Sequence, residues 1–122
     1  MILVDTVIWA DHFGKPDARL MGLLEEDEVH IHPHIIGELA LGNLRQHDIV
    51  IGYLQRLPQS VVASDKEVLA TIRLHRLSGS GIGYSDAHIM ASVLQSPGML
   101  LWTRDRRLNA VVHRFGRGWT SD

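Results

Sequence analysis

The chain has 122 residues, of which 45% are hydrophobic and 21% are charged, and it contains no cysteine. This length suits a single domain over residues 1–122, and the missing cysteines exclude a disulfide framework, a thiolate zinc site and a cysteine nucleophile. The start MILVDT lacks the basic stretch of a signal peptide, and no apolar run approaches the roughly 20 residues of a membrane span. We therefore expect a cytoplasmic protein that makes no contact with a membrane.

Charge is divided unevenly along the chain. Residues 1–72 hold eleven acids and five Lys or Arg, a net charge of 5 − 11 = −6, whereas residues 73–122 hold seven Arg and three Asp, a net charge of 7 − 3 = +4. This asymmetry predicts an acidic feature and a basic face within one small domain. Clustering on solvated helices is the alternative.

The first half of the sequence alternates short apolar runs with helical periodicity. Pro33 suits the first position of a helix, and Pro58 ends one. The predicted elements are a strand over 2–5, a helix over 17–26, a strand over 28–32, a helix over 33–42 and a helix over 48–57. Within the second strand and its exit, the histidines 30, 32 and 34 are interpreted as a partly exposed strand end and not as metal ligands.

The second half continues the alternation. Ser64 and Glu67 form a capping-box pattern that opens a helix. The predicted elements are a strand over 60–63, a helix from 64 to about 77, a Gly-rich loop over 78–83, a helix over 84–95, a strand over 99–103, a helix over 106–115 and an edge strand over 118–120. The whole pattern predicts an α/β fold with a mainly parallel sheet of four to five short strands covered on both faces.

Four acids stand at positions that such a sheet would bring together. Asp5 and Asp105 follow two predicted strands, and Glu38 and Asp86 lie in helices expected to start near the same sheet edge, where ligands bind in this architecture. Four converging carboxylates would repel by about 3 kcal/mol per pair at ~5 Å and an effective dielectric of ~20. A hard divalent cation such as Mg²⁺ or Mn²⁺ would relieve that repulsion.

Each acid also has an ordinary structural explanation. Asp5 and Asp105 can cap the helices that follow them, and Asp86 can accept hydrogen bonds in the first turn of its helix. Glu38 can pair with Arg45, two turns on, or with His34, one turn back.

The stretches MILVDTVIWADHF, HPHIIGELALGNL, GIGYSDAHIMAS and LLWTRDRRL resemble, in order and spacing, the motifs of PIN-domain ribonucleases, and specifically of VapC toxins. The resemblance implies a PIN-like three-layer α/β/α domain. It matches Asp5, Glu38, Asp86 and Asp105 to the acidic quartet of the family. It also matches Thr6 and Thr103 to the polar residues beside the first and last acids, so that Thr6 could orient a water molecule at the site.

The family resemblance implies an endoribonuclease that depends on Mg²⁺, with Mn²⁺ as a possible substitute, and that is the toxin of a bacterial type II toxin–antitoxin system. Its expected partners are an RNA substrate, a cognate VapB-type antitoxin and a second copy of the chain in a homodimer. Because Mg²⁺ usually takes only one or two carboxylates directly, Asp5 and Asp86 are the predicted direct ligands. Glu38 and Asp105 would act through water or on a second ion.

Arg104, Arg106 and Arg107 surround Asp105, and three arginines exceed what one carboxylate needs for neutralisation. At a helix N-terminus they predict a binding site for substrate phosphates, with a solvated basic face as the alternative. Two other functions stay open. One is a PIN-like binding module without activity, and the other is a phospho-accepting receiver domain, which the positions of the only lysines, Lys15 and Lys66, disfavour.

Overall fold

The computed structural model describes residues 1–120 of the chain. Its sheet consists of β1 (Ile2–Val4), β2 (Val29–His30) and β3 (Leu100–Trp102), in the order β2-β1-β3. Both pairs of neighbours are parallel, with Ile2 opposite Val29 on one side and Leu100 on the other. All three carboxyl ends therefore lie at one edge of the sheet, as the positions of the four acids require.

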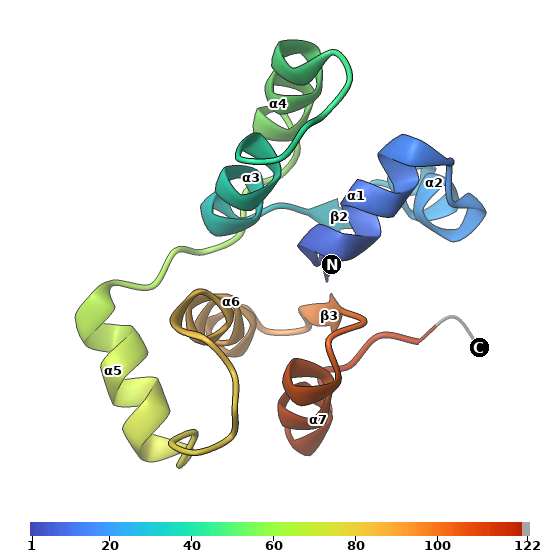
Figure 1. Cartoon of the computed structure of the whole chain (residues 1–122). Coiled ribbons are helices and arrows are strands. Elements are labelled where there is room, and N and C mark those ends of the chain that lie inside the picture. Colours follow the sequence, from blue (N-terminus) through green and yellow to red (C-terminus); the bar gives the residue numbers. More distant parts are fainter. Residues whose placement is uncertain (121–122) are drawn as a thin grey trace.

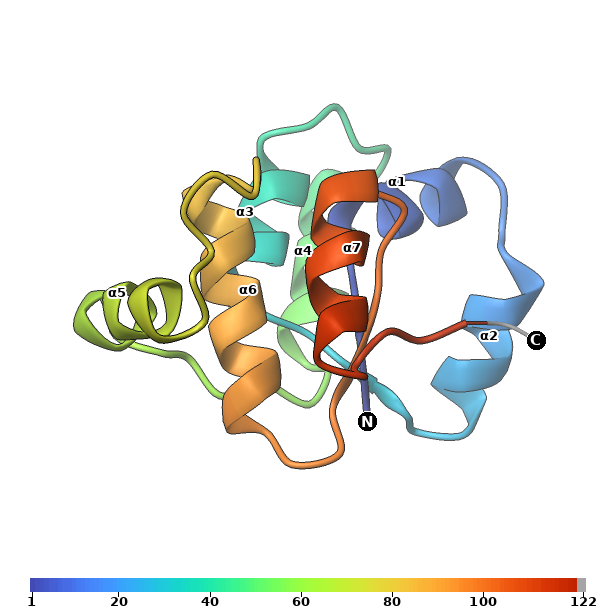
Figure 2. The same cartoon turned by 90° about the horizontal axis from the view of Figure 1, so that it is seen from below.

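Helices follow each strand and cover the sheet. They are α1 (Thr6–Gly14), α2 (Ala18–Glu25), α3 (Pro33–Ala40), α4 (His47–Gln55), α5 (Asp65–Leu74), α6 (Tyr84–Gln95) and α7 (Arg106–Arg114). Figures 1 and 2 show α1 and α2 on one side of the strands, α3, α5 and α6 on the other, and α7 beyond β3. The predicted layered α/β architecture is confirmed. None of the helices within residues 1–120 combines the length and apolarity that crossing a bilayer would need.

Local sequence explains where most helices begin and end. The Asp17 carboxylate accepts the backbone N–H groups of Arg19 and Leu20 at the start of α2. Ser64 and Glu67 form the predicted capping box of α5. That helix ends at Leu74, before the predicted position 77, because Arg76 adopts a left-handed conformation with φ of 52°. The helix predicted over 84–95 has the bounds of α6.

The predicted number of strands was wrong, since residues 1–120 contain three strands and not four or five. The segment 60–63 forms no strand. The residue before it, Gln59, makes a single parallel bridge with Ile31, and the chain then leaves the sheet edge to reach α5. The predicted edge strand at 118–120 is likewise reduced to one bridge, between Leu101 and Gly118. Both segments extend the sheet edges without forming a ladder.

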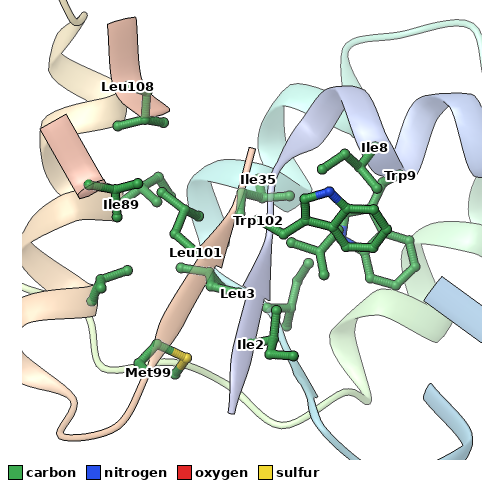
Figure 3. Packing of buried hydrophobic residues seen from close by; sticks show 14 of the residues in the cluster. Ile2, Leu3, Ile8, Trp9, Ile35, Ile89, Met99, Leu101, Trp102 and Leu108 are labelled. Atoms are coloured by element: carbon green, nitrogen blue, oxygen red, sulfur yellow. The ribbon is translucent and has the colours of Figure 1, made fainter. Parts of the chain in front are cut away.

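The apolar core lies on both faces of the sheet. Leu3, Val4 and Leu101 are fully buried, and Figure 3 shows Ile89 of α6 on one side of these strands and Ile8 and Trp9 of α1 on the other. A strand that is apolar at every position fits a sheet covered on both faces. This packing fixes the strand ends, and with them the first residues of α1 and α7.

Candidate active site

Asp5 occupies the junction between β1 and α1, where its carboxylate is held by two hydrogen bonds. Oδ1 accepts the backbone N–H of Thr6 at 2.9 Å, so the capping interpretation is confirmed. Oδ2 accepts the Thr103 hydroxyl at 2.7 Å, which ties the end of β1 to the end of β3. With only 9% of its surface exposed, Asp5 is the most buried of the four acids.

Thr103 connects two of the acids. Its hydroxyl donates to Asp5 and accepts the backbone N–H of Asp105 at 3.1 Å. Asp105 itself caps α7, because its Oδ1 accepts the backbone N–H of Leu108 at 2.9 Å. One hydroxyl thus links the buried Asp5 carboxylate to the backbone of the exposed Asp105 at neighbouring strand ends.

Glu38 lies on the exposed face of α3 and reaches toward α1. Its Oε1 accepts the Thr6 hydroxyl at 3.2 Å. The ion pairs that sequence alone allowed, with Arg45 or with His34, are not formed within residues 1–120. Thr6 therefore holds Glu38 beside Asp5 and stands between the two acids.

Asp86 lies in the first turn of α6, where its side chain is half-buried and does not cap the helix. Burial is the largest cause that raises the pKa of this carboxyl to about 6, and the negative charge of Asp5 is the next. The charges of Asp105 and Glu38 raise it further, while the backbone amide of Gly83 opposes the rise. All three other acids are thus close enough to Asp86 to disfavour its ionised form, which supports the predicted convergence.

The donor set has the chemistry of a site for a hard cation, but not a preformed cage. Within residues 1–120 none of the four acids forms an ion pair with Lys, Arg or His. No three His, Asp or Glu side chains in this part of the chain are grouped closely enough to hold a metal as they stand. Such an open arrangement of carboxylate oxygens fits Mg²⁺, which keeps most of its waters and needs only one or two protein ligands.

The arginines around Asp105 divide into two kinds. Arg104 forms ion pairs with Asp11 of α1 and, at 3.6 Å, with Asp17 at the start of α2. Arg106 and Arg107 are exposed and make no ion pair with any acid among residues 1–120. The charge of Arg104 is therefore balanced inside the fold, whereas two positive charges beside the site are available to a ligand.

A contact between α3 and α6 escaped the sequence analysis. His34 Nδ1 lies 3.0 Å from Ser85 Oγ, and its ring stacks on that of His88 with centroids 4.4 Å apart. These contacts join the helix that carries Glu38 to the helix that carries Asp86. No sequence signal marks them, because the partners are about 50 positions apart.

The interpretation of the nearby histidines as a partly exposed strand end was wrong for His32. That residue is fully buried and caps α3, since its Nδ1 accepts the backbone N–H of His34 at 3.0 Å. The side-chain cap in front of Pro33 is the local reason that β2 ends two residues earlier than predicted.

No family model matches the chain. Over 116 residues it is 46% identical to Ribonuclease VapC32 of Mycobacterium tuberculosis strain CDC 1551 / Oshkosh, which covers 95% of this chain and 94% of that protein. Ribonuclease VapC32 of strain ATCC 25618 / H37Rv matches with the same values. The chain belongs to the VapC ribonuclease family. Its acidic edge is therefore the candidate active site of a VapC ribonuclease.

A solved structure supports the fold of this VapC family member. The FitAB complex bound to the IR36 DNA fragment contains a chain that superposes with a TM-score of 0.55 at 20% identity, covering 86% of this chain and 85% of that chain. At this identity the likeness concerns the fold alone. It confirms the predicted PIN-like α/β domain.

Proposed function

We propose that this chain is a divalent-metal-dependent endoribonuclease that cleaves RNA phosphodiester bonds and acts as the toxin of a type II toxin–antitoxin pair. The observation that carries the proposal is geometric: Thr6 and Thr103 link Asp5 to Glu38 and to Asp105 at the carboxyl ends of the strands, and none of the four acids is paired with a basic side chain within residues 1–120. The raised pKa of Asp86, with a value of about 6, agrees with this arrangement. Membership of the VapC ribonuclease family supplies the reaction class.

Asp5 and Asp86 are the proposed direct ligands of Mg²⁺, for which Mn²⁺ can substitute. They are the two less exposed acids of the four, whereas Glu38 and Asp105 are exposed and lie further out. The outer pair would contact the ion through water. When bound, the ion polarises the phosphoryl oxygen and lowers the pKa of the attacking water.

The remaining polar groups position these acids. The Thr103 hydroxyl donates to Oδ2 of Asp5, and the Thr6 backbone N–H donates to Oδ1. The two hydrogen bonds together fix the orientation of the Asp5 side chain. Thr6 does the same for Glu38. Removing an outer contact of this kind typically lowers metal affinity or activity by 10- to 100-fold. Arg106 and Arg107 would bind substrate phosphates, whereas Arg104 is engaged with Asp11 and Asp17.

The proposal includes the partners that the family implies. These are an RNA substrate, a cognate VapB-type antitoxin and a second copy of the chain in a homodimer, in the cytoplasm. An acidic, open edge suits an inhibitory segment that carries arginine, because guanidinium groups pair with carboxylates through two parallel hydrogen bonds.

The test is turnover of end-labelled RNA by the purified protein with Mg²⁺ or with EDTA, using Asp5→Asn as the inactive control. We expect cleavage that requires the metal and the Asp5 carboxylate, and sequencing of the product ends identifies the target. Equal cleavage by wild type and Asp5→Asn would point to a contaminating nuclease. Binding without cleavage under all metal conditions would favour the inactive binding module.

A further inference from the structure

A cavity lies outside the acidic site, between the loop over 78–83 and α7. It has a volume of about 600 Å³. Its lining is Ser80, Arg106, Arg107, Ala110, Val111 and Arg114. Two of these arginines are the residues that sequence analysis associated with substrate phosphates, and Arg114 extends the same surface along the helix.

Positive charge in this cavity is not balanced by acids. None of the three lining arginines forms an ion pair within residues 1–120. Arg114 donates one hydrogen bond to the His75 carbonyl at 3.2 Å and lies over the Phe115 ring, so its position is fixed while its charge stays uncompensated.

The loop wall of the cavity depends on a glycine. Gly81 has a φ of +87°, and a Cβ atom there would lie 2.7 Å from Cδ of Arg107. The Arg107 side chain therefore lies directly against the loop backbone, and the loop leads within three residues into α6. Both walls of the cavity thus reach the acidic site, because α7 is capped by Asp105 and α6 carries Asp86 in its first turn.

The lining arginines extend along α7. Arg106 and Arg114 are eight residues apart on one helix, which corresponds to about 12 Å along its axis. A ligand that satisfies all three must carry negative charges repeated over that length, starting beside the acids. A single-stranded polynucleotide has this property, and guanidinium groups bind phosphate oxygens through paired hydrogen bonds.

We propose that this cavity binds the backbone of the RNA strand on one side of the scissile bond, with Arg106, Arg107 and Arg114 each contacting a phosphate. This inference rests on the proposed function and adds to it the path that the substrate takes away from the acids. An acidic protein segment is the competing ligand, and the acids at one end of the cavity disfavour it by repulsion.

The test is the salt dependence of binding, measured in EDTA so that no cleavage occurs. Fluorescence anisotropy follows a labelled single-stranded RNA and, separately, a labelled polyglutamate peptide of similar charge. The cavity variant combines Arg106→Gln, Arg107→Gln and Arg114→Gln. The matched control combines Arg45→Gln, Arg56→Gln and Lys66→Gln, which remove three exposed positive charges elsewhere.

Each phosphate contact contributes about 0.7 to the slope of log K against log salt for a single strand. With three contacts removed, we expect the magnitude of the slope for RNA to fall by about 2 in the cavity variant and to stay unchanged in the control variant. Equal slopes for wild type and cavity variant, equal losses in both variants, or no measurable binding by wild type would overturn the proposal. So would a loss confined to the peptide, which would assign the cavity to an acidic protein segment.

These outcomes are separate from failure of the proposed function. A wild-type protein that cleaves RNA with Mg²⁺ while the cavity variant binds RNA with an unchanged slope contradicts only the substrate path. A wild-type protein that binds RNA through the cavity but never cleaves it contradicts only the nuclease function.

Discussion

The pKa of Asp86 depends on the other three acids of the site. Burial and the charges of Asp5, Asp105 and Glu38 raise its pKa to about 6. This carboxyl therefore keeps its proton to a higher pH than an ordinary aspartate, and a bound cation would favour its ionised form. Asp5 differs, since two hydrogen bonds hold its oxygens in place.

We predict that Asp5→Asn and Asp86→Asn each lower RNA cleavage by more than about 100-fold, which exceeds the effect typical of outer contacts to a metal. An amide oxygen at residue 5 can still accept the Thr6 amide, so the fold should persist. Rates on labelled RNA and circular dichroism of the same samples measure the two effects. Turnover at the wild-type rate by either folded variant contradicts a role as ligand.

The raised pKa of Asp86 also predicts a stability effect. The folded protein binds this proton more tightly than the unfolded chain, whose carboxyl titrates near 3.8, so stability falls as pH rises from about 4 to about 6. Above about pH 6 the ionised Asp86 carboxylate keeps the stability of the folded state low.

Without metal at pH 7.5, Asp86→Asn should melt several degrees above wild type, and this difference in melting temperature should be smaller at pH 5. Glu25→Gln, on an exposed position of α2, is the control for losing one charge. A variant that melts below wild type at pH 7.5 would mean that Asp86 is stabilised by its surroundings.

At the scale of single elements, α3 depends on a neutral histidine at its start. Burial is the largest cause that lowers the pKa of His32 to about 4, with smaller contributions from His34 and His88. Neutral His32 accepts the N–H of His34 through Nδ1, which a doubly protonated ring cannot do. The helix that carries Glu38 is therefore sensitive to acid.

We predict that the stabilising contribution of the His32 cap decreases as pH falls from 6.5 to about 4, because the histidine of the unfolded chain takes up its proton at a higher pH than the buried His32. His32→Asn keeps an N-cap oxygen without a titrating group and should flatten the dependence. Urea midpoints at pH 7.5 and pH 5 measure it, best in the Asp86→Asn background, because Asp86 titrates with the opposite sign in this range. Equal pH slopes with and without His32 contradict the prediction.

For the whole molecule, the clustered acids predict stabilisation by divalent cations. A ligand that binds only the folded state contributes about 2.7 kcal/mol at a hundredfold excess over its dissociation constant, which is about ten degrees in melting temperature for a domain of this size. We expect Mg²⁺ or Mn²⁺ to give such a shift, and Asp86→Asn to reduce it. Below about pH 6 protonation of Asp86 should weaken the response.

The control for this measurement is NaCl at equal ionic strength, which screens surface charges without binding a site. A wild-type melting temperature that responds equally to NaCl and to Mn²⁺ would mean that the acids act as separate caps. The prediction does not require substrate, so it tests the site independently of RNA cleavage.

The sequence by itself determined the features that depend on neighbours in the chain. The alternation of apolar runs and amphipathic helices predicted the α/β architecture, and the bounds of α6 were found at 84–95. The caps formed by Ser64 and by Asp105 were predicted because a cap is a contact between residues three positions apart. The strand ends at Asp5 and Asp105 likewise indicated which acids would share a sheet edge.

Tertiary structure alone decided which partners each polar group found. The segment 60–63 has the apolar residues of a strand, but pairing needs a free sheet edge, and the chain leaves that edge after one bridge. Arg104 is next to Asp105 in sequence and yet pairs with Asp11 and Asp17, because packing of α1 and α2 brings those acids to the end of β3. The pKa of Asp86 depends on three acids that lie at least 19 positions away along the chain. Such long-range contacts leave no pattern in a single sequence, since burial and charge at a site are set only when the separate elements pack together.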